Sequence, residues 1–189
     1  MERLLHFLYL IHPLSDELKA YLFRHLKTQE IARNGMLLRG GHICRNVYFI
    51  EKGLLRCFYH KGDTEVSSWF MKEGDVIISI ESFYQQKESY ESIQALEDSV
   101  LYYIAYNELQ YIYKNFLEFN FIGRVLTEKY HELWAQQLYA LRMHTAYERY
   151  QWLLKKHAEL VLRVPGKFIA SYLGIEKTTL SKIKGMKQK

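Results

Sequence analysis

The sequence predicts an α+β fold: a roll of short β-strands flanked by helices, then one long helix and a terminal pair of short helices. Between residues 31 and 104, glycines recur about every ten residues and separate short apolar or β-branched runs, as expected for strands joined by tight turns. Residues 116–143 contain no proline and one glycine, so a single helix of about 40 Å can form. The stretch GKFIASYLGIEKTTLSKIKG, residues 166–185, predicts two short helices broken by a glycine.

The excess of basic over acidic residues is confined to residues 145–189. The whole chain of 189 residues carries 26 Lys+Arg and 21 Asp+Glu. Residues 145–189 contain ten of the basic and three of the acidic residues, which leaves 16 basic and 18 acidic residues before them. A basic terminal segment favours a polyanionic partner, nucleic acid first and a membrane surface second. A solvated basic face is the alternative.

The composition excludes several classes of protein. Two cysteines, Cys44 and Cys57, are too few for a disulfide scaffold or for an all-cysteine zinc or iron–sulfur site. The apolar start of the chain is interrupted by His6 and His12, and no stretch reaches the ~20 apolar residues that span a bilayer. We therefore expect a cytoplasmic protein that does not insert into membranes.

The first part of the chain predicts two helices and then the strands. Residues 4–12 and 15–27 show helical spacing of leucines, with Ser15 as the N-cap of the second helix. The runs VYFIEKG, LLRCFYHKGD, TEVSSWF and SVLYYIAY predict strands, with a hairpin turn around Gly62. Six to eight such strands are typical of a sandwich, jelly roll or small barrel.

The helical period returns after Tyr106, first as a short helix over residues 107–115 and then as the long helix 116–143. The long helix carries two apolar stripes, which predicts that one packs on the roll and the other on a second copy of the chain. Burial of the helix within one chain is the alternative. The stripe that follows a heptad contains Phe119, Ile122, Leu126, Leu133, Ala140 and Met143, and we assign its first five residues to the dimer interface. The second stripe contains Phe121, Val125, Trp134, Leu138 and Leu141.

A domain boundary is expected where the charge changes. Thr145 and Glu148 have the spacing of a capping box that opens the next helix, AYERYQWLLKKH. These observations predict a roll domain over residues 1–115, the long dimerisation helix over 116–143 and a terminal domain over 144–189.

The terminal stretch has the spacing of a helix-turn-helix. Ala170 is small enough for two helices to cross there, and Gly174 suits a turn that needs a positive φ. The second helix, residues 177–184, would lie in the major groove of double-stranded DNA. The residues expected to contact DNA are Lys167, Lys177, Thr178, Thr179, Ser181, Lys182 and Lys184. A helical hairpin whose lysines are only solvated is the alternative.

The order of these elements resembles the Crp/Fnr family of transcription regulators. The resemblance is carried by NGMLLRGGHICRNVYFIEKGLLRCFY, EGDVIISIESF, SIQALEDSVLYYIAYNEL and RYQWLLKKHAELVLRVPGKFIASYLGIEKTTLSKIKG. It implies that the jelly-roll-like β-roll has the cyclic-nucleotide-binding fold, that the long helix forms a homodimer, and that the helix-turn-helix binds a palindromic operator. RNA polymerase is a further partner that such a regulator implies.

Departures from the family concern the effector. Nucleotide-binding members carry a Gly-Glu pair where this chain has Ile78 and Ser79, and an Arg-Ser pair where it has Ser89 and Tyr90. A buried phosphate without an arginine would be poorly compensated, so cyclic AMP is not the expected effector. Any other effector would lie near Ser79, Glu81, Ser82, Ser89 and Tyr90. Alternatively, this loop is only surface, and side chains such as Phe83 fill the pocket.

The recognition helix also departs from the family. Related sequences often carry Ser or Thr followed by Pro-Glu, where this chain has Glu176, Lys177 and Thr178. The operator sequence is therefore not expected to follow that of the family.

The sequence lacks the residue patterns that enzymes and metal-binding proteins of this fold class require. No two of the eight histidines lie within five residues of each other, so the metal site of a cupin enzyme is not expected, and no motif of a hydrolase or nucleotide-binding enzyme is present. We predict neither catalytic residues nor a bound metal or cofactor, with haem held by Cys44 and a histidine as the weaker alternative. A ligand sensor or protein-interaction module that does not bind DNA is the remaining alternative.

Overall fold

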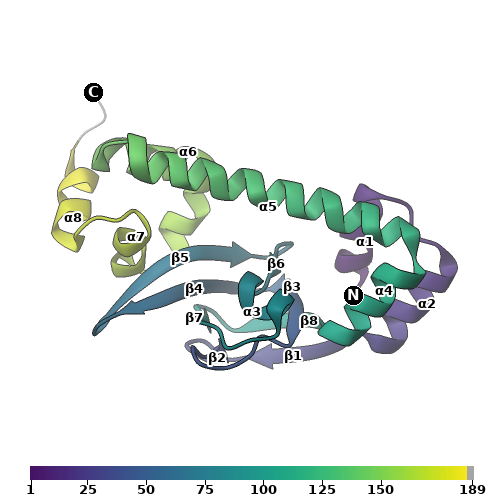
Figure 1. Cartoon of the computed structure of the whole chain (residues 1–189). Helices are drawn as coiled ribbons and strands as arrows, with labels where there is room; N and C mark the ends of the chain where they lie inside the picture. The colour runs from purple at the N-terminus through teal and green to yellow at the C-terminus, as the bar shows by residue number, and fades with distance from the viewer. Residues whose placement is uncertain (187–189) are drawn as a thin grey trace. The chain divides into compact units, whose positions relative to one another are not determined.

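The computed structural model of the chain describes residues 1–186. The chain divides into two compact units, of which the first comprises residues 1–57 and 70–128 and the second residues 58–69 and 129–189. Figure 1 traces the elements of both units along the chain. Because the units are each made of separate stretches, the chain passes between them three times.

The first unit begins with two helices, α1 (Glu2–Ile11) and α2 (Asp16–His25). The Ser15 side chain accepts a hydrogen bond from the backbone of Leu18, which confirms the expected N-cap. The second helix ends two residues earlier than its leucine spacing predicts, because Lys27 pairs with Tyr103 in a strand. Two further helices of this unit are α3 (Ile80–Gln85) and α4 (Tyr106–Asn115).

The strands of the described residues form two four-stranded sheets, with the orders β1-β8-β3-β6 and β2-β7-β4-β5. This agrees with the predicted roll of six to eight strands. Their bounds are β1 Lys27–Ile31, β2 Met36–Leu38, β3 Asn46–Lys52, β4 Leu54–Lys61, β5 Thr64–Lys72, β6 Val76–Ile77, β7 Glu91–Ala95 and β8 Ser99–Ala105.

The core of the roll forms where apolar residues of these strands face inward. Ile50, Leu54, Leu55, Ile93 and Leu101 are completely shielded from solvent. Burying such a side chain contributes about 1.5–3 kcal/mol, so these strands supply much of the stability of the first unit.

The long helix α5 (Leu117–Met143) belongs to both units, as residues 117–128 lie in the first and 129–143 in the second. Its start is held in the first unit by the Glu118 carboxylate, which accepts a 2.6 Å hydrogen bond from the Ser15 hydroxyl. The single continuous helix expected over this region is confirmed.

The second unit adds α6 (Ala146–Arg163), α7 (Gly166–Tyr172) and α8 (Lys177–Gly185). The capping box of α6 is present, with Thr145 and Glu148 each bonding the other's backbone. The expected helix AYERYQWLLKKH forms the first part of α6, and a kink at His157 separates it from a second helical stretch that ends at Arg163. His157 itself leaves the helical conformation, with φ −146° and ψ 53°.

Candidate functional site

The turn between α7 and α8 is built by Gly174. Its φ of +63° lies in the left-handed region, which an L side chain adopts only with strain. The Gly174 amide donates to the Ser171 carbonyl at 3.1 Å, and the Ile175 amide donates to the Ala170 carbonyl at 3.0 Å. This pair of bonds is a Schellman motif, which ends α7 and lets the chain turn directly into α8.

The two helices bury their apolar faces in the second unit. Ile169 and Ala170 of α7 and Leu180 and Ile183 of α8 are all at most 6% exposed. Since Ala170 carries only a methyl group, it fits this packed position. Because the buried Leu180 and Ile183 lie on one side of α8, the opposite side of the helix faces solvent.

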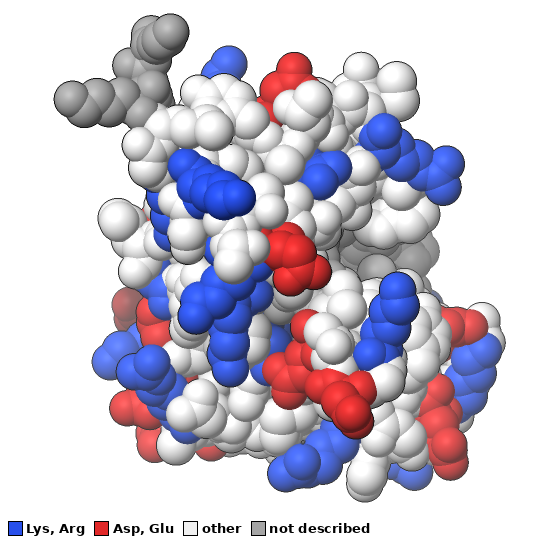
Figure 2. All heavy atoms as spheres, turned by 90° about the vertical axis from the view of Figure 1, so that its left-hand side faces the viewer, with Lys and Arg blue, Asp and Glu red and all other residues white. Residues whose placement is uncertain are grey.

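The outer side of α8 carries the polar residues that the sequence singled out. Lys177, Thr178, Ser181, Lys182 and Lys184 are exposed, and Thr179 is half-buried. Lys167 at the start of α7 is exposed as well, with its ammonium 4.7 Å from the centre of the Phe168 ring. Figure 2 shows the face viewed from this end, on which Lys and Arg side chains are interspersed with uncharged atoms and with Asp and Glu side chains. The arrangement offers hydrogen-bond donors and positive charge from one short helix.

The N-terminus of α8 has no side-chain cap. Glu176 occupies the N-cap position without a side-chain hydrogen bond to the backbone. Its carboxylate still suits the partial positive charge of the helix N-terminus. The first amides of α8 are therefore not engaged by their own cap residue.

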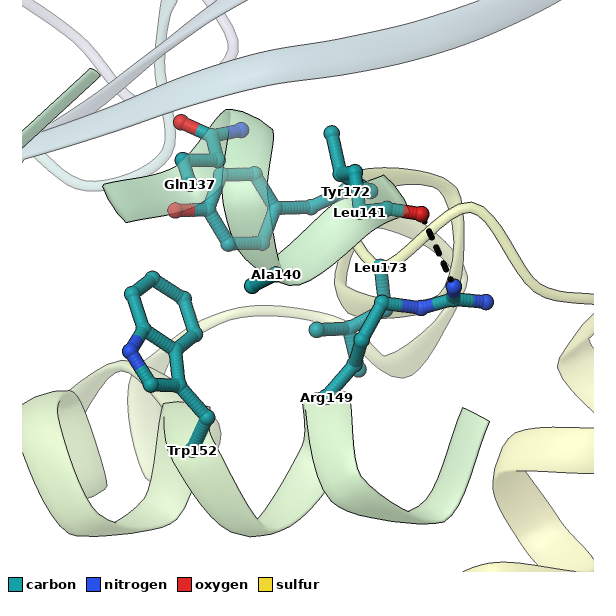
Figure 3. Close-up of a pocket in the computed structure, with 7 residues that line it drawn as sticks. All are labelled: Gln137, Ala140, Leu141, Arg149, Trp152, Tyr172 and Leu173. Atoms are coloured by element: carbon teal, nitrogen blue, oxygen red, sulfur yellow. Dashed lines mark hydrogen bonds between the residues drawn. The ribbon is translucent and has the colours of Figure 1, made fainter. Parts of the chain in front are cut away.

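Arg149 ties α6 to the end of α5. Its Nη1 donates to the Leu141 carbonyl at 3.3 Å and to the His144 carbonyl at 3.0 Å. Figure 3 shows Arg149 beside a small hollow between α5, α6 and α7, with the bond to Leu141 dashed. The hollow is lined by Gln137, Ala140, Leu141, Arg149, Trp152, Tyr172 and Leu173. Sequence reasoning missed Arg149, because no local pattern indicates that a side chain will satisfy distant helix-end carbonyls.

Three residues of the stripe assigned to the dimer interface are buried within the single chain, so the assignment is corrected for these three. Phe119, Ile122 and Ala140 are at most 8% exposed within the single chain, and Leu126 and Leu133 are half-buried. The Phe119 ring packs against Tyr113 of α4, with ring centres 5.5 Å apart. Phe119, Ile122 and Ala140 are therefore already covered without a second copy, whereas Leu126 and Leu133 are covered only in part.

The opposite side of α5 is the exposed apolar one. Trp134 is 57%, Tyr139 59% and Met143 66% exposed. A shallow hollow on this side is lined by His131, Trp134, Ala135, Leu138, Tyr139, Arg142 and Met143. Two of these, Trp134 and Leu138, belong to the second stripe that the sequence showed. Both stripes are apolar, so the sequence alone did not distinguish the inner from the outer one.

The expected effector residues fall into two groups. Ser79, Ser82 and Ser89 are buried, whereas Tyr90 is 67% exposed and Glu81 is half-buried. Phe83, the side chain expected to fill a pocket here, is fully buried. The structure therefore brings the three serines together in the interior and leaves Tyr90 outside.

Ser79 and Ser89 bond to each other, and Ser82 and Ser89 bond to backbone groups around them. The Ser79 and Ser89 hydroxyls lie 2.9 Å apart, and the Ser89 hydroxyl donates to the Glu91 carbonyl. The Ser82 hydroxyl accepts from the Cys44 amide at 2.8 Å and donates to the Lys87 carbonyl at 2.5 Å. The hydrogen bonds of these hydroxyl groups therefore hold the loop in its conformation.

Charged groups beside this loop are also paired or buried. Lys87 lies 2.6 Å from Glu81, and this hydrogen bond lowers the pKa of the Glu81 carboxyl. Burial raises the pKa of Glu91, partly offset by a hydrogen bond from Ser79. Burial also raises the pKa of the Cys57 thiol. Burial therefore disfavours both the carboxylate form of Glu91 and the thiolate form of Cys57.

The described part of the chain offers neither a metal site nor a membrane-spanning helix. Within residues 1–186, no three His, Cys, Asp or Glu side chains are grouped so that they could hold a metal ion. Over the same residues, we find no helix with the length and apolar character that crossing a bilayer requires.

Comparison with known proteins identifies the roll. Residues 28–116 match the family model described as the cyclic nucleotide-binding domain. The roll has the cyclic nucleotide-binding fold. The match includes both sheets and the serine loop, and it ends at Phe116, directly before α5. No curated protein sequence matches the chain.

Solved structures extend the likeness of fold beyond the roll. A protein described as a transcriptional regulator of the Crp/Fnr family from Eubacterium rectale is 17% identical, with a TM-score of 0.73 over 94% of this chain and 85% of the other. A mutant of CooA from Carboxydothermus hydrogenoformans is 19% identical, with a TM-score of 0.72 over 90% and 79% of the two chains. FixK2 from Bradyrhizobium japonicum is 17% identical, with a TM-score of 0.71 over 84% and 82%. At these identities the likeness concerns the fold.

Proposed function

We propose that this chain is a cytoplasmic transcription regulator of the Crp/Fnr type that binds a palindromic DNA site as a homodimer. The observation that carries the proposal is the α7–α8 pair, whose polar helix face is exposed while its apolar face is buried. The description of the similar structure from Eubacterium rectale as a Crp/Fnr regulator supports the same function.

The α7–α8 pair is proposed as a helix-turn-helix. The Schellman turn at Gly174 and the buried contact of Ala170 with its surroundings give two short helices joined by a tight turn. In such a motif the second helix enters the major groove, and residues near its start reach base edges. On this proposal Lys177 and Thr178 would contact bases, and Lys182 and Lys184 would contact bases or phosphates. Thr179, Ser181 and Lys167 would hold phosphates.

The DNA-binding function is tested by selection of DNA from a random-sequence duplex pool on the purified chain. We expect enrichment of an inverted repeat and a mobility shift that weakens steeply as the salt concentration rises. Recovery of no enriched sequence, together with no shift of genomic fragments at low salt, would contradict the proposal. That outcome would favour a ligand sensor or a protein-interaction module instead.

The homodimer is proposed to form through the exposed side of α5 that carries Trp134 and Leu138. A second copy is the occupant we assign, because two identical apolar helix faces cover each other in an isologous contact. The chain should sediment as a dimer, and Leu138→Glu should shift it to a monomer because the new charge would be buried. Gln136→Glu adds the same charge outside the hollow and should remain dimeric. Equal behaviour of the two variants would contradict the assignment.

The roll is proposed not to respond to cyclic AMP. Ser89 and Tyr90 stand where family members carry an Arg-Ser pair. Ser89 is already bonded to Ser79, and Ser82 to the backbone. Cyclic AMP should therefore leave the melting temperature unchanged. A ligand at ~100 times its Kd would stabilise the chain by about 2.7 kcal/mol, so a clear shift with cyclic AMP would contradict this part of the proposal. RNA polymerase is the further partner through which such a regulator would act.

A further inference from the structure

The hollow on the exposed side of α5 contains two side chains that are able to carry positive charge. All of its lining residues belong to α5, and they are apolar or aromatic except for His131 near one end and Arg142 near the other. Within the described part of the chain, no Asp or Glu lines the hollow. A second copy that covers this face would therefore remove both basic groups from water, and the hollow itself supplies no carboxylate to compensate them.

His131 is the lining residue whose charge depends on pH near neutrality. Its ring is exposed, and its centre lies 6.2 Å from the centre of the Trp134 ring. A histidine side chain changes its charge between about pH 5 and 8, whereas an arginine stays protonated throughout. Acidification therefore adds a second positive charge to the side chains that line the hollow.

The carboxylates near His131 already have partners on their own helix. The Glu128 carboxylate bonds Arg124 at 2.7 Å, and the Glu132 carboxylate accepts from the Gln136 side-chain amide at 2.9 Å. Neither glutamate lines the hollow. The charged residues within one turn of His131 on α5 are Glu128, Lys129 and Glu132. A protonated His131 thus faces the outside of the helix without a carboxylate beside it in the hollow.

A symmetric contact places a basic group opposite His131 in either orientation of the two helices. Identical faces that cover each other are related by a two-fold axis. If the two copies of α5 run parallel, His131 meets the partner's His131. If they run antiparallel, His131 meets the partner's Arg142, because these two residues lie at opposite ends of the hollow. Protonation of His131 therefore brings like charges together in both orientations, and like charges that face each other across an interface are costly.

We propose that His131 makes the dimer formed by α5 sensitive to pH, because the neutral imidazole permits the contact and the imidazolium opposes it. The proposal rests on the proposed homodimer and adds acid as a condition that separates the two copies. A palindromic site engages two copies of the recognition helix. Acid should therefore also weaken DNA binding, although His131 lies on α5 and not on the outer face of α8.

The test measures the dissociation constant of the dimer by sedimentation of the full chain over a concentration series in which the dimer dissociates. Between about pH 7.5 and about pH 5.5, the wild-type constant should rise by about tenfold or more. His131→Gln, which keeps a polar side chain without the titrating charge, should change by less than about twofold. The duplex enriched from a random pool should likewise lose more affinity for the wild type than for His131→Gln at the lower pH.

Controls separate the charge of His131 from a general effect of acid. His6→Gln removes another exposed histidine, which lies on α1, and should keep the pH dependence of the wild type. Circular dichroism at both pH values checks that each variant is folded, and His131→Phe, expected to stay dimeric at both, replaces His131→Gln should that variant not fold.

Three outcomes count against the proposal. A wild-type dissociation constant that is equal at the two pH values would overturn the pH dependence and leave the homodimer in place. An equal rise in the wild type and in the folded His131 variant would do the same, since the effect would then come from another group. A chain that is monomeric at the higher pH would instead overturn the proposed homodimer.

Discussion

The serine loop of the roll and helix α8 use similar side chains in opposite ways. In the loop, Ser79, Ser82 and Ser89 are buried; the Ser79 and Ser89 hydroxyls bond to each other, and those of Ser82 and Ser89 bond to nearby carbonyls. On α8, Lys177, Ser181 and Lys182 are exposed on the outer face. The first set holds its own segment together, and the second set is presented outward.

The difference indicates where a partner can bind. A ligand at the serine loop would have to break existing buried hydrogen bonds, which are costly to leave unmade. A partner at α8 would displace mainly water. We therefore expect substitutions in the loop to affect stability and substitutions on α8 to affect binding, and three predictions test this contrast.

The largest effect is expected from the lysines of α8. The double variant Lys177→Ala with Lys182→Ala should weaken binding of the selected duplex by about 100-fold, or roughly 3 kcal/mol, because two charged contacts near the bases are lost. Its midpoint of urea unfolding should stay nearly unchanged, since both side chains are exposed. Fluorescence anisotropy and urea unfolding measure the two quantities.

A charge-matched pair provides the control for this prediction. Lys155→Ala with Lys156→Ala removes the same charge from exposed positions of α6 and should weaken binding far less. Equal losses in the two double variants would mean that overall charge, and not the face of α8, determines affinity.

A smaller and opposite effect is expected from Ser82. Ser82→Ala removes two hydrogen bonds and leaves the Cys44 amide unsatisfied in the interior, which should lower the free energy of unfolding by about 2 kcal/mol. Ser181→Ala, whose hydroxyl bonds only the Lys177 carbonyl of its own helix among the described contacts, should leave stability within about 0.5 kcal/mol. Urea unfolding of both variants measures these free energies. Similar losses of stability in the two variants would contradict the difference between loop and helix.

The smallest effect concerns the pH dependence set by Glu91. Burial raises its pKa in the folded state, so the folded chain holds this proton at pH values where the unfolded chain has released it. Its contribution to stability is therefore complete below the unfolded pKa and is lost as the pH rises through the folded pKa. Glu91→Gln should remove this loss and be more stable than the wild type at neutral pH. A pH series of unfolding free energies that is identical for both proteins would contradict the assignment.

Local sequence patterns were sufficient for much of the fold. The Ser15 cap, the Thr145 capping box and the positive φ at Gly174 each depend on a few neighbouring residues, and each is present in the structure. The spacing of glycines likewise predicted the roll, because tight turns have strict backbone requirements.

Contacts between distant residues were not predictable in the same way. Both stripes of α5 are apolar, and the burial of Ile122 and the packing of Tyr113 against Phe119 show which one faces inward. The bond from Ser67 to Ser171 joins residues 104 positions apart, and no local pattern indicates such a pair. The outer residues of α8 were found because helical spacing alone separates them from the buried Leu180 and Ile183.

The most direct test of the account is the salt dependence of DNA binding by the wild-type chain. Anisotropy titrations of the selected duplex between low and moderate salt should give a steep linear fall of log affinity with log salt. A dimer that makes about six phosphate contacts predicts a slope of roughly −5. Absence of binding at low salt, or an affinity that does not change with salt, would contradict the proposal that α8 reads DNA.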